Sequence, residues 1–581
     1  MDERKTVIGI DLGTTYSVVA HVSPAGLVTC LPGRDGEVLT PSCVLVERDG
    51  SVVVGREARR AATQAPTRVV EGFKRHMGDG AWRWTVDEQS YSPQDLSSVV
   101  LRRLADDAER ILGPVGGVII TVPAYFGDRE RTATLDAATM ADLDVIALIN
   151  EPTAAALADA FESYIAAGGD GADLTKAAIA STAPGVNVIC DLGGGTFDVT
   201  AIRINGRDFD IIASGGTRLG GRDFDDQIIE AMVRHLFDHN GPDPFDDPLA
   251  QARMRVAAEQ AKHTLTVKTE ATLPAPYDRV PPMSITRRQF EELSKPLLDR
   301  AREVIESVMA DAKLEWAGVE SLLLVGGASR MPMFRRMTTA LSGKTPQAGL
   351  QPDLIVSQGA AVYGAILQVQ ERGGTLPVGM PVPAEREDET GCYAVCETDG
   401  AAAPGDLADA PSCDPLSASG SDGGNGKAFD AGFAAAAWSV QVRDVTSQSL
   451  GAVVWSPVKG STTNAVIIPR NTRLPAMRSR VFATHEPNQQ RVCVPVVEGD
   501  ATDPGQCTPI GECVIDPLPP GLPQGAFVRV TFSYDISGRV VVQAQELSTR
   551  TSARTVLERY RSEEGGALEA LAAAVAGHGI A

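Results

Sequence analysis

Two copies of one short pattern constrain how this chain can fold. In each copy, an apolar strand runs into Asp-Leu-Gly, turns on small residues and leaves as a second apolar strand, first over residues 7–20 and again over residues 186–202. Glycines remove side chains from the turn, so its backbone N–H groups can approach a phosphate closely. A single glycine hairpin is usually only a hairpin, but two copies with matching flanks indicate two related subdomains facing each other. The repeat therefore predicts a nucleoside triphosphate held between two lobes.

The second copy, Asp191-Leu-Gly-Gly-Gly-Thr-Phe-Asp198, carries most of the chemistry. Asp191 and Asp198 flank the glycines and place carboxylates where a hydrated Mg²⁺ on the phosphate would sit, because this cation prefers oxygen ligands. Thr196 adds a hydroxyl group, and Asp11 occupies the corresponding place in the first copy. The pattern indicates a metal-dependent phosphate site.

The composition excludes several classes of function. At 581 residues the chain is long enough for several domains, and its formal net charge of −22 argues against a nucleic-acid partner or an anionic membrane. The charged residues 1–5 do not resemble a signal peptide, and no apolar run is long enough to span a bilayer. Nine cysteines without an export signal predict reduced thiols in the cytoplasm, and their spacings give a zinc site little support.

Between the two copies, the apolar periodicity alternates between strands and helices. Helical spacing covers residues 94–112 and 128–141, and buried strands are expected over residues 117–123 and 145–149. A further helix is expected to begin near Pro152, since proline is favoured in the first turn of a helix. These elements predict an α/β domain.

A series of longer motifs occurs in order along the chain: Ile10-Asp-Leu-Gly-Thr-Thr-Tyr16, Thr121-Val-Pro-Ala-Tyr-Phe126, Asn150-Glu-Pro-Thr-Ala-Ala-Ala156, Asp191-Leu-Gly-Gly-Gly-Thr-Phe-Asp198, Leu219-Gly-Gly-Arg-Asp-Phe-Asp225, Val325-Gly-Gly-Ala-Ser-Arg330 and Gly359-Ala-Ala-Val362. Together they closely resemble the nucleotide-binding domain of the seventy-kilodalton heat-shock chaperones, the DnaK class, over about residues 6–368. The resemblance implies an α/β actin-like (ribonuclease H-like) two-lobed ATPase domain over residues 1–370, with ATP or ADP and Mg²⁺ as cofactors and a weak intrinsic rate of hydrolysis.

The resemblance implies roles for individual residues. Asp11 and Asp191 would hold Mg²⁺ through its waters, and Lys74, which alone would pass for a solvated surface lysine, would stabilise charge on the transferred phosphoryl group. Glu151 or Asp198 would position the attacking water. The residues that would cradle the phosphates are Thr14, Thr15, Tyr16, Gly194, Gly195 and Thr196, and further nucleotide-binding residues would be Gly13, Gly193, Gly220 and Gly221.

The adenine and ribose would be held by a helix expected over residues 251–267. Its Glu259, Lys262 and Thr266 fall on one face, which without the resemblance would be read as a solvated charged face. In the family this face binds the nucleoside, and the residues that close the other side are Gly326, Gly327, Arg330 and Asp353. His263 stands where the family often has Arg, which predicts an altered stacking surface and weaker nucleotide affinity.

The second half of the chain differs in composition. Residues 371–437 are rich in Ala, Gly, Ser, Pro and Asp and are expected to form a flexible tether. Strand periodicity returns over residues 438–548, which resemble the β-sandwich peptide-binding domain of the same family. Residues 549–581 would form only a short helical stub, with helices over 550–561 and 567–576, because the family's long helical lid does not fit.

The resemblance implies that the sandwich binds an extended apolar peptide. Backbone hydrogen bonds would hold the peptide, and a pocket would take one of its side chains. Phe482 and Val492 would line this pocket, and Trp455 and His485 would arch over it in place of smaller apolar residues. Without the resemblance, Phe482 and Val492 would be read as core.

Communication between the domains is implied by another set of residues. Pro123 and Arg131 match a pair that relays nucleotide state to the docked domain, and Asp444 is retained in the linker. The linker itself reads Val440-Gln-Val-Arg443 where the family has a leucine run, so its docking is expected to lose apolar area. Ala147 replaces an arginine that the family presents to J-domain cochaperones. A glycine- and alanine-rich excursion between Ala160 and Val186 is expected to be an exposed loop.

These observations favour an ATP-dependent, lidless chaperone-like protein acting on extended hydrophobic or unfolded polypeptides, with J-domain and nucleotide exchange partners implied by the resemblance. A nucleotide-sensing adaptor for one specific partner is the alternative that the altered linker, Ala147, Trp455 and the long tether favour. A sugar or small-molecule kinase shares the hairpins but does not explain the sandwich. A broad response to a peptide array separates the first two hypotheses, and phosphate transfer to a metabolite would establish the third.

Overall fold

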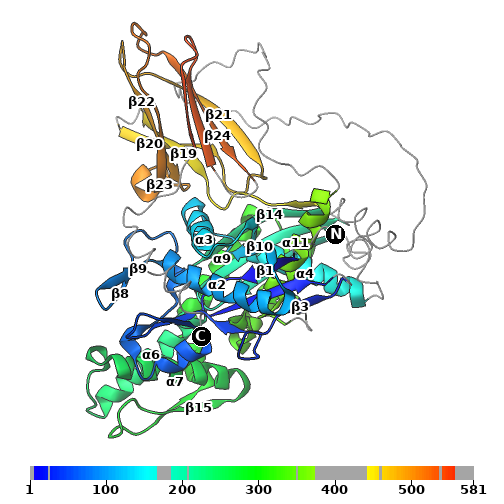
Figure 1. Cartoon of the computed structure of the whole chain (residues 1–581), viewed down its shortest axis with the longest axis vertical. Coiled ribbons are helices and arrows are strands. Elements are labelled where there is room, and N and C mark those ends of the chain that lie inside the picture. Colours follow the sequence, from blue (N-terminus) through cyan, green and yellow to red (C-terminus); the bar gives the residue numbers. More distant parts are fainter. Residues whose placement is uncertain are drawn as a thin grey trace, which may run out of the picture.

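The computed structural model describes residues 6–23, 26–166, 185–205, 208–347, 351–372, 441–456, 461–535 and 540–556. A large α/β body occupies one end of the molecule and a β-sandwich the other, and the sandwich stands next to α3 and β14 of the body (Figure 1). The expected tether over residues 371–437 and the expected helix over 567–576 lie outside the described residues, except for the last two residues of α11.

The body contains two sheets that begin with the same arrangement of strands. The sheet of lobe I has the order β11-β10-β1-β2-β3, with β4 paired to β2, and the sheet of lobe II has the order β17-β12-β13-β14-β18. The strands of lobe I are β1 (Thr6–Asp11), β2 (Tyr16–Val22), β3 (Val28–Cys30), β4 (Thr40–Pro41), β10 (Val115–Val122) and β11 (Val145–Asn150). Those of lobe II are β12 (Gly185–Leu192), β13 (Phe197–Asn205), β14 (Asp208–Thr217), β17 (Val319–Val325) and β18 (Gln441–Arg443).

The duplicated pattern forms the same structure in both lobes. Strands β1 and β2 make an antiparallel hairpin with a parallel neighbour, β10, and strands β12 and β13 repeat this with β17 as the parallel neighbour. In the second hairpin Asp191 lies directly opposite Asp198, because the glycine turn brings the two strands back in register. The two predicted subdomains are therefore present.

Two helices lie between the sheets and join the lobes. They are α4 (Glu151–Ala166) and α11 (Ile355–Arg372), and their apolar residues share one buried cluster with Val7 and Ile119 of lobe I and Ile189 and Leu323 of lobe II. Helix α4 continues to Ala166, so the first part of the excursion expected to be a loop is helical, and residues 167–184 lie outside the described residues. The alanine-rich sequence favours this extra turn.

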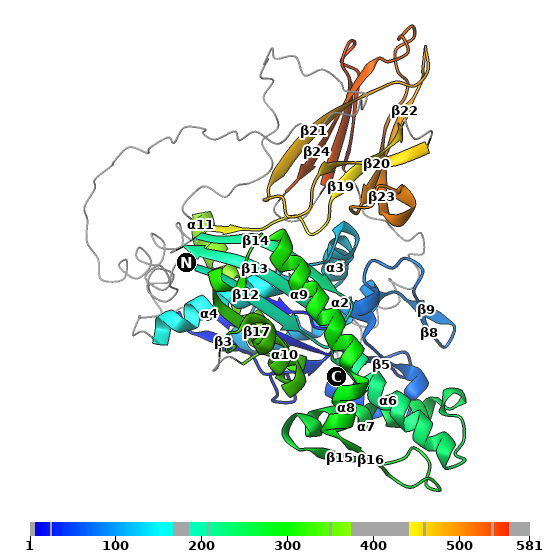
Figure 2. The same cartoon turned by 180° about the vertical axis from the view of Figure 1, so that it is seen from behind.

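Helices also cover the outer faces, as Figures 1 and 2 show. Helices α2 (Pro93–Leu112) and α3 (Asp128–Met140) pack on lobe I, while α9 (Lys295–Asp311) and α10 (Pro332–Ser342) pack on lobe II. Each lobe also carries a smaller unit. That of lobe I comprises β5 (Cys43–Val46), β6 (Val52–Val54), α1 (Arg56–Ala61), η1 (Pro66–Arg68), β7 (Val69–Glu71), η2 (Phe73–His76), β8 (Trp84–Val86) and β9 (Gln89–Tyr91).

The smaller unit of lobe II comprises α6 (Gly221–Asp238), η3 (Pro244–Asp246), α7 (Pro248–Val267), β15 (Glu270–Leu273), β16 (Met283–Thr286) and α8 (Arg287–Leu293). Two short 3₁₀ turns, η4 (Trp316–Gly318) and η5 (Gly327–Arg330), flank β17. Helix α7 carries the three polar residues expected to bind the nucleoside. None of the helices within the described residues is long and apolar enough to cross a membrane.

The sandwich is built from two four-stranded sheets around one apolar core. The first has the order β20-β19-β22-β23 and the second β21-β24-β25-β26. Their elements are β19 (Leu450–Ser456), β20 (Ser461–Ile468), β21 (Ala476–Ala483), β22 (Val492–Glu498), η6 (Pro504–Gln506), β23 (Thr508–Ile515), β24 (Phe527–Tyr534), β25 (Val540–Glu546) and β26 (Ser552–Val556).

Strand β26 corrects the sequence-based expectation of a helix over residues 550–561. It pairs antiparallel with β25, and Ala553 packs against the sandwich core. Alanine and arginine favour a helix locally, but here the unpaired edge of β25 offers backbone hydrogen bonds to the following segment, and tertiary pairing overrides the local preference. The residues beyond 556 lie outside the described part of the chain.

The linker is docked as strand β18 on the body. It pairs in parallel with β14, with Val442 opposite Phe209. Val442 packs against the cluster between the sheets, as does Ala147, and Arg443 forms ion pairs with Asp208 and Asp210. The linker, which was expected to bury less apolar area than a leucine run would, thus also docks through the ion pairs of Arg443.

Candidate nucleotide site and its link to the sandwich

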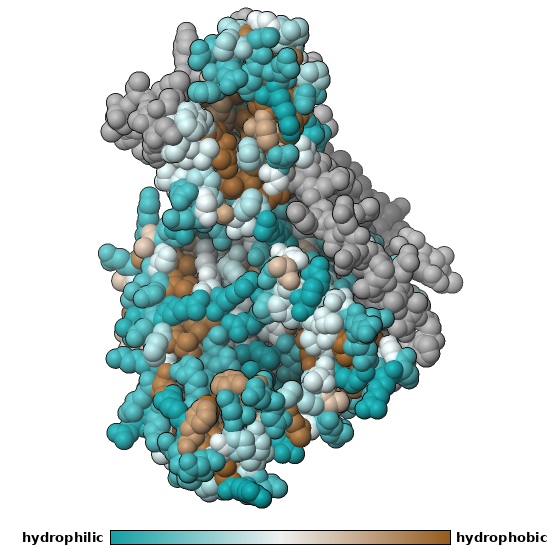
Figure 3. All heavy atoms as spheres, turned by 90° about the vertical axis from the view of Figure 1, so that its left-hand side faces the viewer, coloured by the Kyte–Doolittle hydropathy of each residue, from teal (hydrophilic) through white to brown (hydrophobic). Residues whose placement is uncertain are grey.

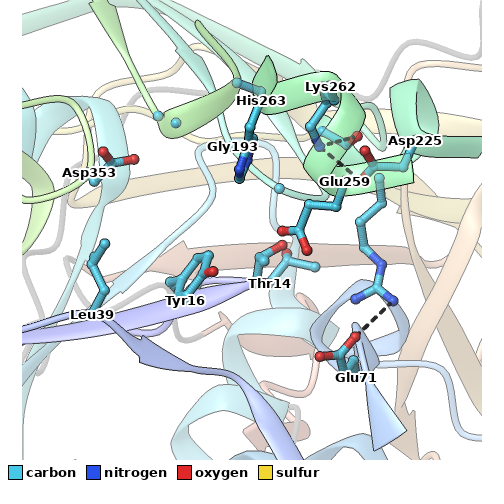
Figure 4. A pocket seen from close by; sticks show the side chains of 18 of the residues that line it. Thr14, Tyr16, Leu39, Glu71, Gly193, Asp225, Glu259, Lys262, His263 and Asp353 are labelled. Atoms are coloured by element: carbon cyan, nitrogen blue, oxygen red, sulfur yellow. Dashed lines mark hydrogen bonds and ion pairs between the residues drawn. The ribbon is translucent and has the colours of Figure 1, made fainter. Parts of the chain in front are cut away.

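A cavity of about 760 Å³ lies between the lobes. Most of the residues predicted to bind nucleotide line it: Asp11, Gly13, Thr14, Thr15, Tyr16, Lys74, Glu151, Asp191, Gly193, Gly194, Thr196, Gly221, Glu259, Lys262, Thr266, Gly326, Gly327, Arg330 and Asp353. Three predicted residues, Gly195, Gly220 and Asp198, lie outside this lining. Glu259 and His263 of α7 lie opposite Thr14 and Tyr16 of the first hairpin (Figure 4). Hydrophilic residues cover much of the body surface on the face drawn in Figure 3.

The end of the cavity that is expected to hold the phosphates contains a buried ion pair. Lys74, in η2, is 4% exposed, and its Nζ donates a hydrogen bond of 2.8 Å to Oε1 of Glu151 at the start of α4. Its ammonium group also lies 5.7 Å from the centre of the Phe126 ring. A buried lysine is retained only when its charge is paired, so Lys74 is not the solvated surface residue that its sequence context alone suggested.

Carboxylates from both hairpins gather beside this pair. Asp11 accepts a hydrogen bond of 2.9 Å from Oγ1 of Thr121, and Asp198 accepts one of 3.2 Å from the backbone N–H of Tyr125. Burial and the charge of Glu151 raise the pKa of Asp11 to about 7 and the pKa values of Asp191 and Asp198 well above their ordinary range. Oδ2 of Asp198 is buried without a hydrogen-bond partner among the described residues.

This donor set fits a hydrated divalent cation. Clustered carboxylates whose charge is not balanced stabilise an added positive charge, and Mg²⁺ usually keeps several waters and takes only one or two carboxylates from the protein. Within the described residues, no group of three or more His, Cys, Asp or Glu side chains could hold a metal directly. Both findings are consistent with Mg²⁺ held through water and phosphate rather than in a protein cage.

The glycine turns pack closely on one another. A Cβ atom added to Gly220 would lie 2.4 Å from the backbone nitrogen of Gly195, and one added to Gly194 would lie 2.0 Å from Oγ1 of Thr15. The backbone N–H of Gly221 donates to the carbonyl of Gly193 over 2.9 Å. Gly220 and Gly195 therefore pack behind the residues that line the cavity, which explains why they are not part of its lining.

The end of the cavity that is expected to hold the nucleoside is built on α7. Nζ of Lys262 donates to Oδ2 of Asp225 over 2.8 Å and to the carbonyl of Gly221 over 2.9 Å, so its charge is already paired. Glu259 forms an ion pair with Arg59 of lobe I, which also donates to the hydroxyl of Tyr16 over 2.6 Å. Burial and the positive charge of Lys262 lower the pKa of His263.

The remaining lining residues include some that were predicted from the sequence and some that were not. Arg330 pairs with Asp353 over 2.6 Å, and Thr266 bonds to its own helix at the carbonyl of Lys262. Arg59 was not predicted, because a lone arginine on a short helix carries no local signal of a partner two hundred positions away. Arg222 and Asp225, which also line the cavity, lie inside the motif over residues 219–225 and could have been found there.

A chain of hydrogen bonds leads from the linker to this site. Asp444 accepts a hydrogen bond of 2.6 Å from Nδ2 of Asn150, whose Oδ1 accepts one from Arg131. Arg131 also donates to the carbonyl of Phe126 over 3.1 Å, in the turn that begins at Pro123. The three residues predicted to relay nucleotide state, Pro123, Arg131 and Asp444, therefore lie together.

The predicted peptide-binding residues occupy one end of the sandwich. The rings of Trp455 and His485, the two residues predicted to form an arch, have centroids 6.0 Å apart. Phe482 and Val492 are half-buried against the sandwich core, and the guanidinium of Arg480 lies 5.8 Å from the centre of the Phe482 ring. An apolar patch is visible on the sandwich in Figure 3.

Comparison with known proteins agrees with this architecture. The model of the family described as Hsp70 protein matches residues 7–376 and 425–573. The chain is 33% identical over 577 residues to chaperone protein DnaK of Thermotoga maritima, covering 97% of this chain and 82% of that protein. It is 33% identical over 559 residues to chaperone protein DnaK of Thermosipho melanesiensis, covering 94% and 79%. These matches confirm the predicted resemblance and fold class, and the chain belongs to the Hsp70 family.

Proposed function

We propose that this protein is an ATP-dependent chaperone in which the state of the nucleotide cleft controls how the sandwich holds extended hydrophobic polypeptide. The chain is an ATPase of the Hsp70 family. We assign its ATPase domain to residues 1–370. Of the sandwich expected over residues 438–548, residues 441–443 instead form β18 on lobe II, and β26 extends the sandwich to Val556. One observation carries the coupling: the linker touches both lobes, through β18 on β14 of lobe II and through Asp444 on Asn150 of lobe I.

The chemistry of the cleft follows from its residues. Mg²⁺, held through water by Asp11 and Asp191, would neutralise charge on the phosphates of ATP. Lys74 supplies a fixed positive charge where negative charge grows on the transferred phosphoryl group, and its pairing with Glu151 keeps it in place before reaction. Glu151 and Asp198 are the carboxylates that would orient the attacking water. The intrinsic rate of hydrolysis is expected to be weak.

The coupling follows from the position of the linker. If the lobes rotate about the helices between them, the edge of β14 and the Asn150 side chain move relative to each other, and the linker cannot keep both contacts. Closure and opening of the cleft would therefore favour different linker arrangements, and a ligand that binds one arrangement better shifts the population toward it.

At the sandwich, an extended peptide would lie beneath Trp455 and His485 with one apolar side chain near Phe482 and Val492. The large arch residues favour a narrow channel, since an indole fills more space than an aliphatic side chain. Recruitment of a J-domain cochaperone would need a contact other than the usual arginine, because Ala147 instead packs against the same cluster as Val442. A nucleotide exchange factor remains a proposed partner by family membership alone.

The decisive experiment is ATP turnover by the purified full chain, with Mg²⁺, with and without excess extended apolar peptide. Stimulation by the peptide would support the coupled chaperone. Turnover that the peptide leaves unchanged would contradict the coupling and leave an ATPase with a separate binding domain. Nucleotide binding without any turnover would contradict the ATPase role and favour a nucleotide-sensing adaptor.

A further inference from the structure

A buried glutamate of the sandwich caps a helix of the ATPase domain. Glu498, the last residue of β22, is 6% exposed, and its Oε1 accepts a hydrogen bond of 3.0 Å from the backbone N–H of Asp128 in the first turn of α3. A Cβ atom added to Gly127 would lie 2.4 Å from Oε2 of Glu498, so the contact depends on the absence of a side chain there. This contact exists only while the two domains are docked.

The charged groups that act on Glu498 come from helix α3, and two of the three are acidic: Asp128, Glu130 and Arg131. Tyr534 of strand β24 lies beside Glu498, Asp128 and the linker residue Asp444. Arg129 and Asp535 in turn act on Asp128. On the sandwich itself, Asp500 accepts a hydrogen bond from Ser449 and pairs with Arg470.

The hydrogen bonds that the structure describes for Arg129 and Arg131 go to neutral acceptors. The hydrogen bonds of Arg131 go to the carbonyl of Phe126 and the side-chain oxygen of Asn150, and that of Arg129 goes to the carbonyl of Pro509. Docking therefore brings several carboxyl groups together in a buried interface.

Burial of an ionised carboxyl beside other carboxyls is unfavourable, and a proton removes that cost. Burial raises the pKa of Glu498 to about 8, with the charges of Asp128 and Glu130 adding to the effect and the N–H of Asp128 and the charge of Arg131 opposing it. Burial likewise raises the pKa of Asp128 to about 6 and raises that of Asp444. Burial in the docked arrangement therefore shifts each of the three groups toward its protonated form, and Glu498 most of the groups with a stated value.

We propose that docking of the sandwich on the ATPase domain takes up a proton at Glu498, so that the balance between docked and separated arrangements depends on pH. When the domains separate, Glu498 meets water and returns to the ordinary pKa of about 4.3. Below that value the carboxyl is protonated in both arrangements, and docking has its full stability. As pH rises toward 8, the separated form loses its proton first, so docking weakens until the docked form is also ionised.

The test is an equilibrium measurement of docking on the full chain. Dyes on genetically encoded unnatural amino acids at the exposed positions Arg288 and Ser479 report the distance between α8 and the sandwich by energy transfer, with Mg²⁺ and ATP present, from pH 6 to pH 9. For one proton, the docking constant is expected to fall by up to about tenfold per pH unit below pH 8 and to level off above it.

Glu498→Gln keeps the shape and an acceptor for the N–H of Asp128 but cannot ionise. In this variant, the number of protons taken up on docking, given by the slope of the logarithm of the docking constant against pH, should fall by about one. The variant should also be more docked than the wild type at pH 9. Glu512→Gln, a change of the same kind at an exposed position of β23, should keep the wild-type slope. A wild-type docking constant that does not change with pH, or a Glu498→Gln slope equal to that of the wild type, would overturn the proposal.

A second variant keeps the proposal testable if Glu498→Gln does not fold. Asp128→Asn retains the backbone N–H that binds Glu498 but removes the charge that faces it. The docking constant should therefore stop changing with pH at a lower pH than in the wild type. An unchanged end point would also count against the proposal.

Discussion

Asn150 and Asp444 are joined by a hydrogen bond of 2.6 Å although they lie 294 positions apart in the chain. Asn150 is the last residue of β11, and the next residue, Glu151, accepts a hydrogen bond from Lys74 in the nucleotide cleft. The linker and the phosphate end of the cleft are thus separated by a single peptide unit. A displacement of Asp444 can reach the pair of Lys74 and Glu151 without a long pathway through the protein.

Removal of the linker carboxylate should uncouple the domains. In Asp444→Ala, Nδ2 of Asn150 loses its partner, and we expect the stimulation of ATP turnover by peptide to fall severalfold while basal turnover stays within about twofold of the wild type. A double-mutant cycle with Asn150→Ala would measure the coupling between the two side chains. The matched control is Asp278→Ala, an exposed residue between β15 and β16. Full peptide stimulation in Asp444→Ala would contradict this relay.

Lys74→Ala should abolish most of the hydrolysis. Loss of one preorganised charge at a developing anion usually lowers turnover by about 10²–10³-fold. Nucleotide binding should survive, because most of the cavity lining is unchanged. Single-turnover hydrolysis and nucleotide affinity, measured on the same preparation, separate the two effects. Lys295→Ala, at the exposed start of α9, serves as the control. Near-normal turnover would show that Lys74 has only a structural role.

Gly220→Ala should damage the phosphate cradle. The new methyl group would meet the backbone of Gly194 and Gly195 at 2.4–2.5 Å, and overpacking of this kind costs about 1–3 kcal/mol. We expect a lower melting temperature and weaker binding of ATP, measured by thermal unfolding with and without nucleotide. Gly318→Ala adds the same methyl group where no atom lies within 4 Å and should change neither. Equal behaviour of the two variants would contradict the close packing.

Docking of the linker should depend on salt. Arg443 pairs with Asp208 at 3.3 Å and with Asp210 at 3.1 Å, and Arg473 pairs with Asp210 at 3.4 Å. Because partly exposed pairs each contribute about 0–1 kcal/mol and are screened by salt, Arg443→Ala with Arg473→Ala should shift docking severalfold at low salt and much less at 1 M salt. Arg478→Ala, on exposed β21, is the control, and the energy-transfer assay described above provides the measurement. A shift of the same size at both salt concentrations would point to packing instead.

Trp455→Ala should speed the release of bound peptide. Trp455 is 49% exposed and faces His485, so its removal would open one side of the arch. We expect the peptide off-rate to rise by about tenfold, corresponding to roughly 1.4 kcal/mol of lost contact, in fluorescence competition experiments. Met477→Ala, also exposed but on β21, is the control. An unchanged off-rate would place the peptide elsewhere.

The sequence was sufficient where the structural signal is local. The two Asp-Leu-Gly hairpins, their glycine turns and the flanking strands could be predicted, because strand periodicity and the need for glycine in a crowded turn are properties of neighbouring residues. The same holds for the polar face of α7, on which Glu259, Lys262 and Thr266 recur at helical spacing. Even so, only the resemblance to a family distinguished this face from a solvated one.

Tertiary structure decided the features that join distant segments. The pairing of Arg59 with Glu259, the strand β26 in place of a helix, and the contact of Glu498 with Asp128 each depend on residues brought together by folding. Lys74 illustrates the difference: its sequence context is that of a surface residue, and only the buried carboxylate of Glu151 gives its charge a partner. Local propensities select elements, but burial and long-range pairing determine which charges meet, because desolvation makes an unpaired charge costly only inside the folded protein.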